Sequence, residues 1–366
     1  MKISHKNRTL RLFSIFFLIV QVSSCGTNPH SQPGTGKGSI ALFITDNISM
    51  YQQVVSTITA VRLINSGTAE VCAVLQDPVT LNIADLKNLA QYADLMQCSE
   101  GRYNRIDIDI RKDTHVMDQV GTASDCSFTS FIDESGQTRP LACDSGTGIC
   151  TLSLQTGARG NSFQVQEDRY NDLGIDFDLK QFTITDFNNP ASCSVTMAVS
   201  PVSVADLNKS GRSHGVTGSI ANLDTAAETF SLIASGGTLT VDYSGILPSL
   251  QPNVDQLLLF AENEGLLVNV LTGDIDIASG SIAANRLYVK ASGTVSNVNG
   301  APTWSFTLTF QPGKTVAASY HPPAVIHGAF TDGAWVNVKF DGYDAAHALY
   351  PAASIEVLPE GTVLEN

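Results

Sequence analysis

Residues 105–110 read Arg-Ile-Asp-Ile-Asp-Ile, a strict alternation of charged and apolar side chains. Successive side chains of a β-strand point to opposite faces, so this period of two predicts a strand with its isoleucines in a core and its aspartates outside. The same alternation occurs at Ile40, Leu42 and Ile44, before the turn-forming Thr45-Asp46-Asn47. We therefore expect a mainly β fold.

One short helix is predicted in the amino-terminal half, over residues 82–96. Ile83, Leu86 and Ala93 recur there at helical spacing, and Asn82 is a suitable N-cap. Residues 114–169 hold three cysteines among many Gly, Ser and Asp residues. This composition indicates a disulfide-braced insertion of hairpins.

The first 24 residues have the pattern of a secretory signal peptide. Basic residues without any acidic one accompany the apolar run 12–22, which is too short to span a bilayer. The leader ends at Ser23-Ser24-Cys25-Gly26, which resembles the lipobox of bacterial lipoproteins, where small residues precede an acylated cysteine. We expect lipidation of Cys25. Because Gly26 replaces the Asp that often retains such lipoproteins in the inner membrane, we expect an outer-membrane location.

The other six cysteines are an even number, which in an exported chain predicts up to three disulfides. Many connectivities are open, and the sequence does not rank them. Our hypothesis pairs Cys72 with Cys98 and Cys143 with Cys150, which leaves Cys126 for Cys193. A zinc site is not indicated, because the chain has no close CxxC pair and no His at finger-like spacing.

The chain is acidic, with 35 carboxylates against 21 Lys and Arg residues and a net charge of −14. Loss of the leader removes four of those cations and makes the exported chain more acidic. Such a surface repels nucleic acid and anionic lipid headgroups, so we expect neither as a partner. The charged fraction of 15% is low, which fits a β-rich exported protein better than a helical cytosolic one.

The chain divides into five predicted segments. The signal peptide (1–24) precedes a flexible tether (25–37) and a β-sandwich domain with its insertion (38–205). The remainder repeats itself, since residues 216–224 recur in pattern as residues 291–299. Two small β-barrel repeats, 214–290 and 291–358, are the simplest explanation.

Two bacterial families resemble these segments. Residues 38 to about 205 resemble the family called domain of unknown function 4382, in the strand that ends at Thr45-Asp46, in Gly101-Arg102-Tyr103 and in Asp176-Phe177-Asp178. The repeats resemble domain of unknown function 5666, in their Gly-Thr-Val-like start and Gly-led Val-x-Val strand. The resemblances imply an immunoglobulin-like or transthyretin-like sandwich and two barrels like the oligonucleotide-binding (OB) fold. They bring no catalytic residues.

Two motifs occupy the linker between the sandwich and the repeats. Asp206, Asn208 and Ser210 imitate the first half of a calcium loop, although Thr217 stands where a bidentate Glu completes the shell. Calcium is therefore a weak cofactor candidate, and an Asx-rich turn is the alternative. Gly211-Arg212-Ser213-His214-Gly215 matches the GxSxG nucleophile pattern, but a strand follows it in place of the helix that such an elbow needs.

Three Asp-x-Asp pairs place two carboxylates on one face of a strand: Asp107/Asp109, Asp176/Asp178 and Asp274/Asp276. Such pairs bind calcium or act as acid and base on a glycosidic bond, although solvated strand faces produce them too. Weaker candidates are three histidines for a transition metal and five aromatic residues for sugar stacking. These are His321, His327 and His347, and Tyr288, Trp304, Tyr320, Trp335 and Tyr343.

The sequence thus predicts a lipid-anchored outer-membrane protein that is not an enzyme. We expect it to bind or scaffold a polysaccharide or another envelope protein. An envelope hydrolase and a calcium-stabilised adhesion module are the alternatives.

Overall fold

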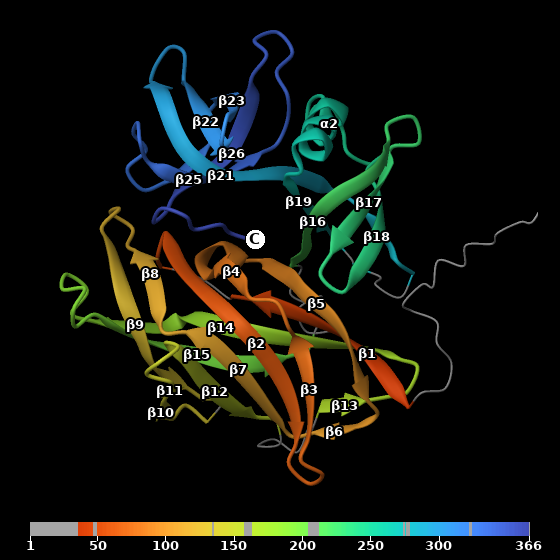
Figure 1. Ribbon diagram of the computed structural model, residues 1–366, viewed down its shortest axis with the longest axis vertical. Coiled ribbons are helices and arrows are strands. Elements are labelled where there is room, and N and C mark those ends of the chain that lie inside the picture. The colour runs from red at the N-terminus through yellow and green to blue at the C-terminus, as the bar shows by residue number, and fades with distance from the viewer. Residues whose placement is uncertain are drawn as a thin grey trace, which may run out of the picture. The chain divides into compact units, whose positions relative to one another are not determined.

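The computed structural model describes residues 36–46, 50–133, 135–156, 163–203, 212–273, 275, 279–321 and 324–365. These residues are mainly β, as predicted (Figure 1). The amino-terminal elements are β1 (Lys37–Thr45), β2 (Gln53–Asn65), β3 (Glu70–Leu75), β4 (Val79–Asn82), the 3-10 helix η1 (Ile83–Leu86), β5 (Leu89–Ser99), β6 (Gly101–Tyr103), β7 (Arg105–Arg111), β8 (Asp113–Met117), β9 (Ala123–Ile132), β10 (Thr138–Pro140), β11 (Ala142–Cys143), β12 (Ile149–Gln155), β13 (Phe163–Val165), β14 (Tyr170–Thr185) and β15 (Ser194–Val202).

The carboxy-terminal elements follow the linker. They are β16 (Ser213–Asp224), β17 (Thr229–Ala234), β18 (Gly237–Asp242), the helix α2 (Val254–Glu264), β19 (Leu267–Thr272), β20 (Ser281–Ala283), β21 (Arg286–Asn299), β22 (Ser305–Gln311), β23 (Lys314–Ser319), β24 (Val325–His327), β25 (Trp335–Phe340) and β26 (Tyr350–Val357).

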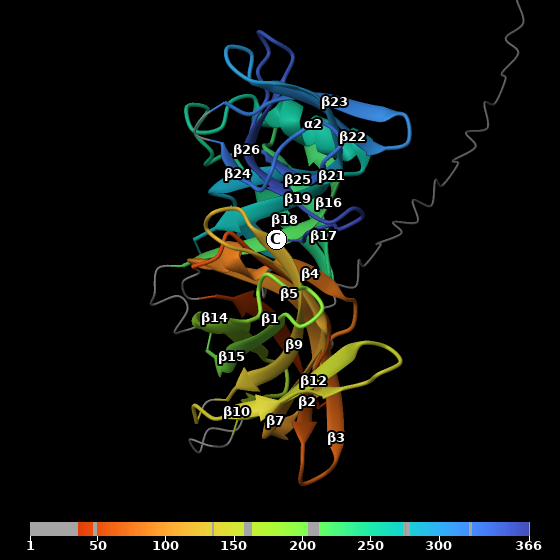
Figure 2. The same ribbon diagram turned by 90° about the vertical axis from the view of Figure 1, so that its left-hand side faces the viewer.

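The amino-terminal part is a two-layered β-sandwich. One layer runs β12-β7-β2-β3, and the other runs β9-β15-β14-β1-β5. β8 pairs with both β2 and β9 and so joins the layers. Figure 2 shows the two layers, with β14 and β15 on the left and β2 and β12 on the right. Among the described strands no pairing joins β12, at the edge of the first layer, to β9, at the edge of the second, which leaves the sandwich open on that side.

The alternating stretch forms β7, and its three isoleucines are fully buried. They contribute to the sandwich core together with Ile40, Leu42 and Ile44 of β1. The predicted orientation of both alternating stretches is confirmed, because the apolar face of each strand meets the opposite layer.

The predicted helix over residues 82–96 is wrong. Only η1 is helical, and Asn82 does cap it, since its Oδ1 accepts from the Ala84 N–H at 3.3 Å. The rest is β5, which pairs with β1 along its length. β5 is buried on both faces: Ala93 enters the sandwich core, whereas Ala90 and Tyr92 enter the core of the carboxy-terminal part. Apolar residues on both faces removed the period of two that would have identified a strand.

The α-helix of the described chain lies elsewhere, between β18 and β19. Helix α2 buries Leu257, Leu258 and Ala261 in the carboxy-terminal core. Gly265 ends it in the left-handed conformation at φ +65°, which glycine adopts without steric cost. The sequence analysis did not anticipate this helix.

The carboxy-terminal strands pair in the same order twice. In the second half β21, β22, β23, β26 and β25 form a closed ring of pairings, with β23 and β26 parallel. In the first half β16 pairs with β17 and β19, β17 with β18, and β18 runs parallel to β20. β21 belongs to both halves, because its first residues pair with β19 and its later ones with β22. The expected boundary between residues 290 and 291 therefore falls inside one continuous strand.

The sandwich and the carboxy-terminal part share a sheet and a core. Ser213, His214 and Gly215 of β16 pair in parallel with β5. The Tyr92 hydroxyl of β5 donates to the Ser235 carbonyl at 2.9 Å.

No helix among the described residues has the length and apolar character to cross a membrane.

Candidate functional site

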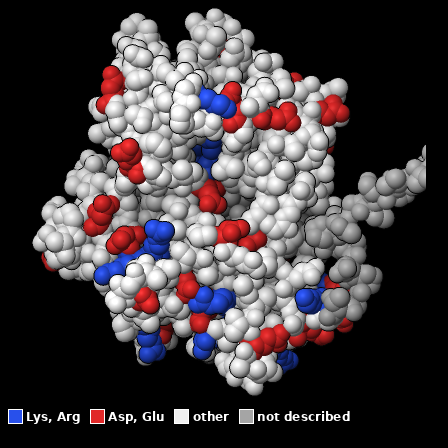
Figure 3. All heavy atoms as spheres, in the orientation of Figure 1, with Lys and Arg blue, Asp and Glu red and all other residues white. Residues whose placement is uncertain are grey.

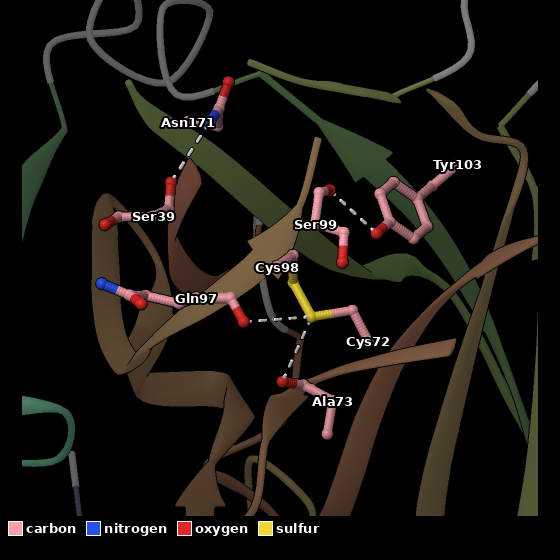
Figure 4. The surroundings of a disulfide bond; sticks show 8 residues. All are labelled: Ser39, Cys72, Ala73, Gln97, Cys98, Ser99, Tyr103 and Asn171. Atoms are coloured by element: carbon pink, nitrogen blue, oxygen red, sulfur yellow. Dashed lines mark hydrogen bonds between the residues drawn. A yellow bond between two sulfur atoms is a disulfide. The ribbon is translucent and has the colours of Figure 1, made fainter. Parts of the chain in front are cut away.

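Three disulfides brace the sandwich, and they are the three hypothesised pairs: Cys72–Cys98, Cys126–Cys193 and Cys143–Cys150. Cys72–Cys98 ties β3 to β5 and so joins the two layers on the side away from the opening (Figure 4). The Cys72 sulfur lies 3.7 Å from the carbonyl oxygens of Ala73 and Gln97. Disulfides form in oxidising compartments, so the chain is an extracellular or periplasmic protein.

The Asp107/Asp109 pair on β7 is neutralised by neighbouring side chains. Arg62 forms a bidentate ion pair with Asp109, with its shorter contact at 2.6 Å, and Arg105 contacts Asp107 at 3.0 Å. Burial opposes ionisation of Asp109, but hydrogen bonds from Arg62 and Thr151 outweigh it and lower the pKa of Asp109. This pair is a structural element of the sheet.

The Asp176/Asp178 pair is placed differently. With Asp172 it forms one row of carboxylates on β14, whose intervening apolar side chains are buried in the core. The row lines a hollow of about 730 Å³ at the open side of the sandwich. We call this hollow the acidic hollow. Gln164, Gln181 and Phe163 also line it.

The carboxylates of the acidic hollow differ in their hydrogen bonds: Asp178 accepts from the Lys180 N–H at 3.0 Å and from Gln181 Nε2 at 3.1 Å, whereas Asp176 is incompletely compensated. Asp176 Oδ1 is buried and has no hydrogen-bond partner among the described residues. Burial raises the pKa of Asp176 to about 6; Asp178 adds to this rise, and Arg212 and Lys180 oppose it. Burial also raises the pKa of Asp172. The hollow therefore favours a ligand that supplies positive charge or hydrogen-bond donors.

A second hollow, of about 490 Å³, lies beside the first on the β9–β12 side. Asp133 lines both and forms an ion pair with Arg139 at 2.9 Å. Hydrogen bonds from Ser135 and Arg139 hold the pKa of Asp133 well below its usual range. Because Asp133 already has a cation, the second hollow lacks the uncompensated charge of the acidic hollow.

A buried group of charged side chains lies where η1 meets β25 and β26. Lys339 Nζ lies 3.2 Å from Asp85 Oδ2, and Asn82 Nδ2 donates to Glu356 Oε2 at 3.0 Å. Lys290 Nζ donates to the Leu364 carbonyl at 2.6 Å. Burial lowers the pKa of Lys290 to about 7, and the nearby Lys339 charge adds to this effect. We call Asp85, Lys339, Glu356, Asn82 and Lys290 the junction cluster.

Burial and the neighbouring Asp85 raise the pKa of Glu356 well above its ordinary value, which favours its uncharged form. Burial acts in the same direction on Asp85, but Lys339 and a hydrogen bond with Glu356 outweigh it and lower the pKa of Asp85. This cluster was not predicted from the sequence. Its one visible signal is a charged residue within an apolar strand, as Glu356 is between Ile355 and Val357.

Acidic side chains are spread over the face drawn in Figure 3, and the basic ones lie next to them.

Ser213 is the first residue of β16 and pairs with Leu89, so it does not sit on a turn from strand to helix. The calcium candidates Asp206, Asn208 and Ser210, the lipidation candidate Cys25 and the Asp274/Asp276 pair lie outside the described residues.

The histidine and aromatic candidates do not form joint sites. His347 contacts Asp344 at 2.7 Å, and the described residues contain no group of three or more His, Cys, Asp or Glu side chains that could hold a metal. Of the five aromatic residues proposed as a stacking platform, only Trp304 and Tyr320 contact each other in the ring contacts of the described residues, and the others have separate partners. The contacts are Trp304 with Tyr320, Tyr343 with Tyr350, Tyr288 with Arg286, and Trp335 with the Thr362 carbonyl.

Residues 37–193 match the family described as Domain of unknown function (DUF4382). The matched region runs from β1 to the loop before β15 and includes the whole carboxylate row of the acidic hollow. It confirms the predicted resemblance of the amino-terminal domain. No curated protein matches the chain.

Proposed function

We propose that this protein is a lipid-anchored module of the bacterial cell envelope that binds another envelope component without catalysis. Its ligand site is the acidic hollow. The observation that carries this proposal is the row Asp172, Asp176 and Asp178, which lines a hollow of about 730 Å³ without the arginine pairing that Asp109 has. A row of carboxylates in which Asp176 keeps an oxygen without a donor among the described residues favours a binding role.

The ligand class follows from the charge of the hollow. Half-buried carboxylates attract Lys or Arg side chains, and they repel acidic polysaccharides. A basic segment of another envelope protein therefore suits the hollow best. Gln164, Gln181 and Phe163 would also suit a neutral polysaccharide, because amides bond to hydroxyls and an aromatic ring packs against a sugar face.

The anchor of the module is Cys25 in this proposal. The leader, the lipobox-like Ser23-Ser24-Cys25-Gly26 and the three disulfides support export followed by acylation. Gly26 favours the outer membrane. Mass spectrometry of the membrane-extracted chain is expected to find an acylated Cys25 as the first residue, and an intact leader would contradict this.

The carboxy-terminal part acts in this proposal as a spacer of two OB-like barrels related to domain of unknown function 5666. The ring of pairings through β21, β22, β23, β26 and β25 supports this assignment, because such a five-stranded ring is the arrangement of an OB fold.

Calorimetric titration tests the binding site. The exported chain, released from the membrane by Cys25→Ser, is titrated with pentalysine and separately with a neutral glucan oligosaccharide. We expect pentalysine to bind at low salt and the triple variant D172N/D176N/D178N to lose that binding. The matched control E100Q/E228Q/E360Q removes three exposed carboxylates elsewhere and is expected to keep it. Equal binding by both triple variants would refute the site, whereas binding of the glucan alone would assign it to polysaccharide.

A hydrolase is the second candidate, on a different residue from Ser213. Asp176 with its raised pKa beside Asp178 has the chemistry of a general acid next to a carboxylate, as glycoside hydrolysis requires. Release of reducing sugar from envelope glycans, abolished by Asp176→Asn, would support this candidate. Binding of a glycan without any release would exclude it.

A further inference from the structure

Lys339 and Asp85 lie in contact although 254 residues separate them in the chain. Lys339 Nζ of β25 lies 3.2 Å from Asp85 Oδ2 of η1, and the two side chains are only 14% and 21% exposed. The contact joins the sandwich to the second carboxy-terminal half. An amine and a carboxyl group held together with little surrounding water have the effective concentration that drives condensation.

Glu356 of β26 is the third member of this arrangement. Its side chain is buried, and Asn82 Nδ2 donates to its Oε2. Oε1 has no donor among the described residues, so it is the oxygen free to carry a proton. Glu356 lies beside Asp85, whose charge acts together with burial to raise the pKa of Glu356 and so favours its protonated form. An uncharged acid in contact with the carboxyl group is what general acid catalysis of amide formation needs.

We propose that Lys339 and Asp85 condense to an intramolecular isopeptide bond, with Glu356 as the catalytic acid and base. A proton first passes from the Lys339 ammonium to Asp85 across their hydrogen bond, which leaves a neutral amine and a neutral acid. The amine lone pair then attacks Asp85 Cγ while Glu356 protonates a carboxyl oxygen.

The atoms of this step balance without any further reactant. The Nζ–Cγ bond forms and the Cγ–Oδ2 bond breaks. Two of the three ammonium protons leave with Oδ2 as water, and the third stays on the amide nitrogen. Glu356 takes back from the nitrogen the proton that it gave and ends as it began. Because the ion pair already contains every atom of the products, no oxidant, nucleotide or metal is required.

Two other lysines of the chain show why the reaction belongs to Lys339. Lys290 is as deeply buried, but its Nζ donates to the Leu364 carbonyl, which is not a carboxyl group. Lys314 lies 2.8 Å from Glu264 Oε2, a closer pair than Lys339 and Asp85. That pair is 45% and 30% exposed, so water competes there. Lys314–Glu264 is therefore the matched internal control.

Mass spectrometry of the full exported chain tests the bond. After reduction of the disulfides, the intact chain is expected to weigh one water less than its sequence. Trypsin cannot cut after an acylated lysine, so peptide 63–87 with Asp85 should stay joined to peptide 315–366 with Lys339. A full-length mass equal to the sequence would overturn the proposal, and so would a joined peptide linking Lys314 to Glu264 in place of Lys339 to Asp85.

Two variants separate the bond from its catalyst. Lys339→Arg keeps the positive charge but is not a nucleophile, and it is expected to have the full mass. Glu356→Gln preserves shape and is expected to reduce the joined fraction at least tenfold at equal incubation time. Undiminished joining in Glu356→Gln would overturn the role of Glu356. Because the wild-type mass is decisive by itself, misfolding of a variant does not leave the bond untested.

Discussion

The acidic hollow and the junction cluster both contain carboxylates that are at least half-buried, yet these carboxylates differ in what surrounds them. At the junction Asp85 is paired with the cation of Lys339, from a distant part of the chain, and Asn82 donates to one oxygen of Glu356, whose other oxygen has no donor among the described residues. In the hollow, Asp176 keeps an oxygen without a partner among the described residues. A buried carboxylate that is paired with a cation indicates a group that stabilises the fold. A half-buried carboxylate without such an ion pair indicates a group that can bind a ligand.

Removing a partner at the junction is expected to have the largest effect on stability. Lys339→Ala removes both the ion pair with Asp85 and the bond proposed to form from it, and it leaves a buried carboxylate without a cation, so it should lower the free energy of unfolding by at least about 3 kcal/mol. Urea denaturation at neutral pH measures this loss. Asp178→Asn, in the hollow, is the contrasting substitution and should leave the midpoint nearly unchanged. Equal losses in the two variants would remove the distinction between the two regions.

The carboxy-terminal segment after β26 covers the junction cluster. Shortening one buried side chain of this segment is expected to have the second-largest effect on stability. Leu364 is 1% exposed and packs with Val55 and Leu358. Leu364→Ala should cost about 2–3 kcal/mol because it leaves a cavity. The neighbouring Val363 is 49% exposed, so Val363→Ala should cost little. Similar melting temperatures for the two variants would show that the segment does not seal the junction.

The pH dependence of stability should reveal the raised pKa of Glu356. Its pKa is raised in the folded state, so its contribution to stability is complete below its ordinary pKa and is lost as the pH rises through the raised one. The melting temperature of Glu356→Gln, relative to that of the wild type, should therefore rise between pH 4.5 and pH 8. A constant difference over this range would contradict a protonated Glu356.

The smallest expected effect has the opposite sign. Asp176 also has a raised pKa, about 6, so at neutral pH the folded state carries a charge that it disfavours. Asp176→Asn should stabilise the fold by about 1 kcal/mol, since partial exposure screens the charge, and should weaken ligand binding at the same time. Calorimetric melting and the pentalysine titration, made on the same sample, check both changes. A stabilised variant with undiminished binding would show that Asp176 is not part of the site.

Local patterns predicted those parts of the fold whose strands have one buried face. The alternating isoleucines of β7 and the apolar face of β1 predicted the sandwich core, and the even number of cysteines predicted its disulfides. β5 was misread as helix because it is buried on both faces. The prediction failed where the environment of a strand depends on distant segments.

The candidate site divides in the same way. The carboxylate row of the hollow was partly visible as Asp176-x-Asp178, because those residues are neighbours on one strand. The junction cluster was not, since Asp85 and Lys339 are 254 residues apart and only the tertiary fold brings them together. The difference in compensation between Asp109 and Asp176 likewise depends on cross-strand neighbours that no local pattern contains.

The strand shared by the two carboxy-terminal halves has a mechanical consequence. β21 runs without interruption from its pairing with β19 to its pairing with β22. A flexible linker between two independent modules would let them reorient relative to each other. A continuous strand that belongs to the sheets of both halves resists bending and twisting between them. We therefore expect the two halves to respond to tension at the end of the chain as one rigid unit.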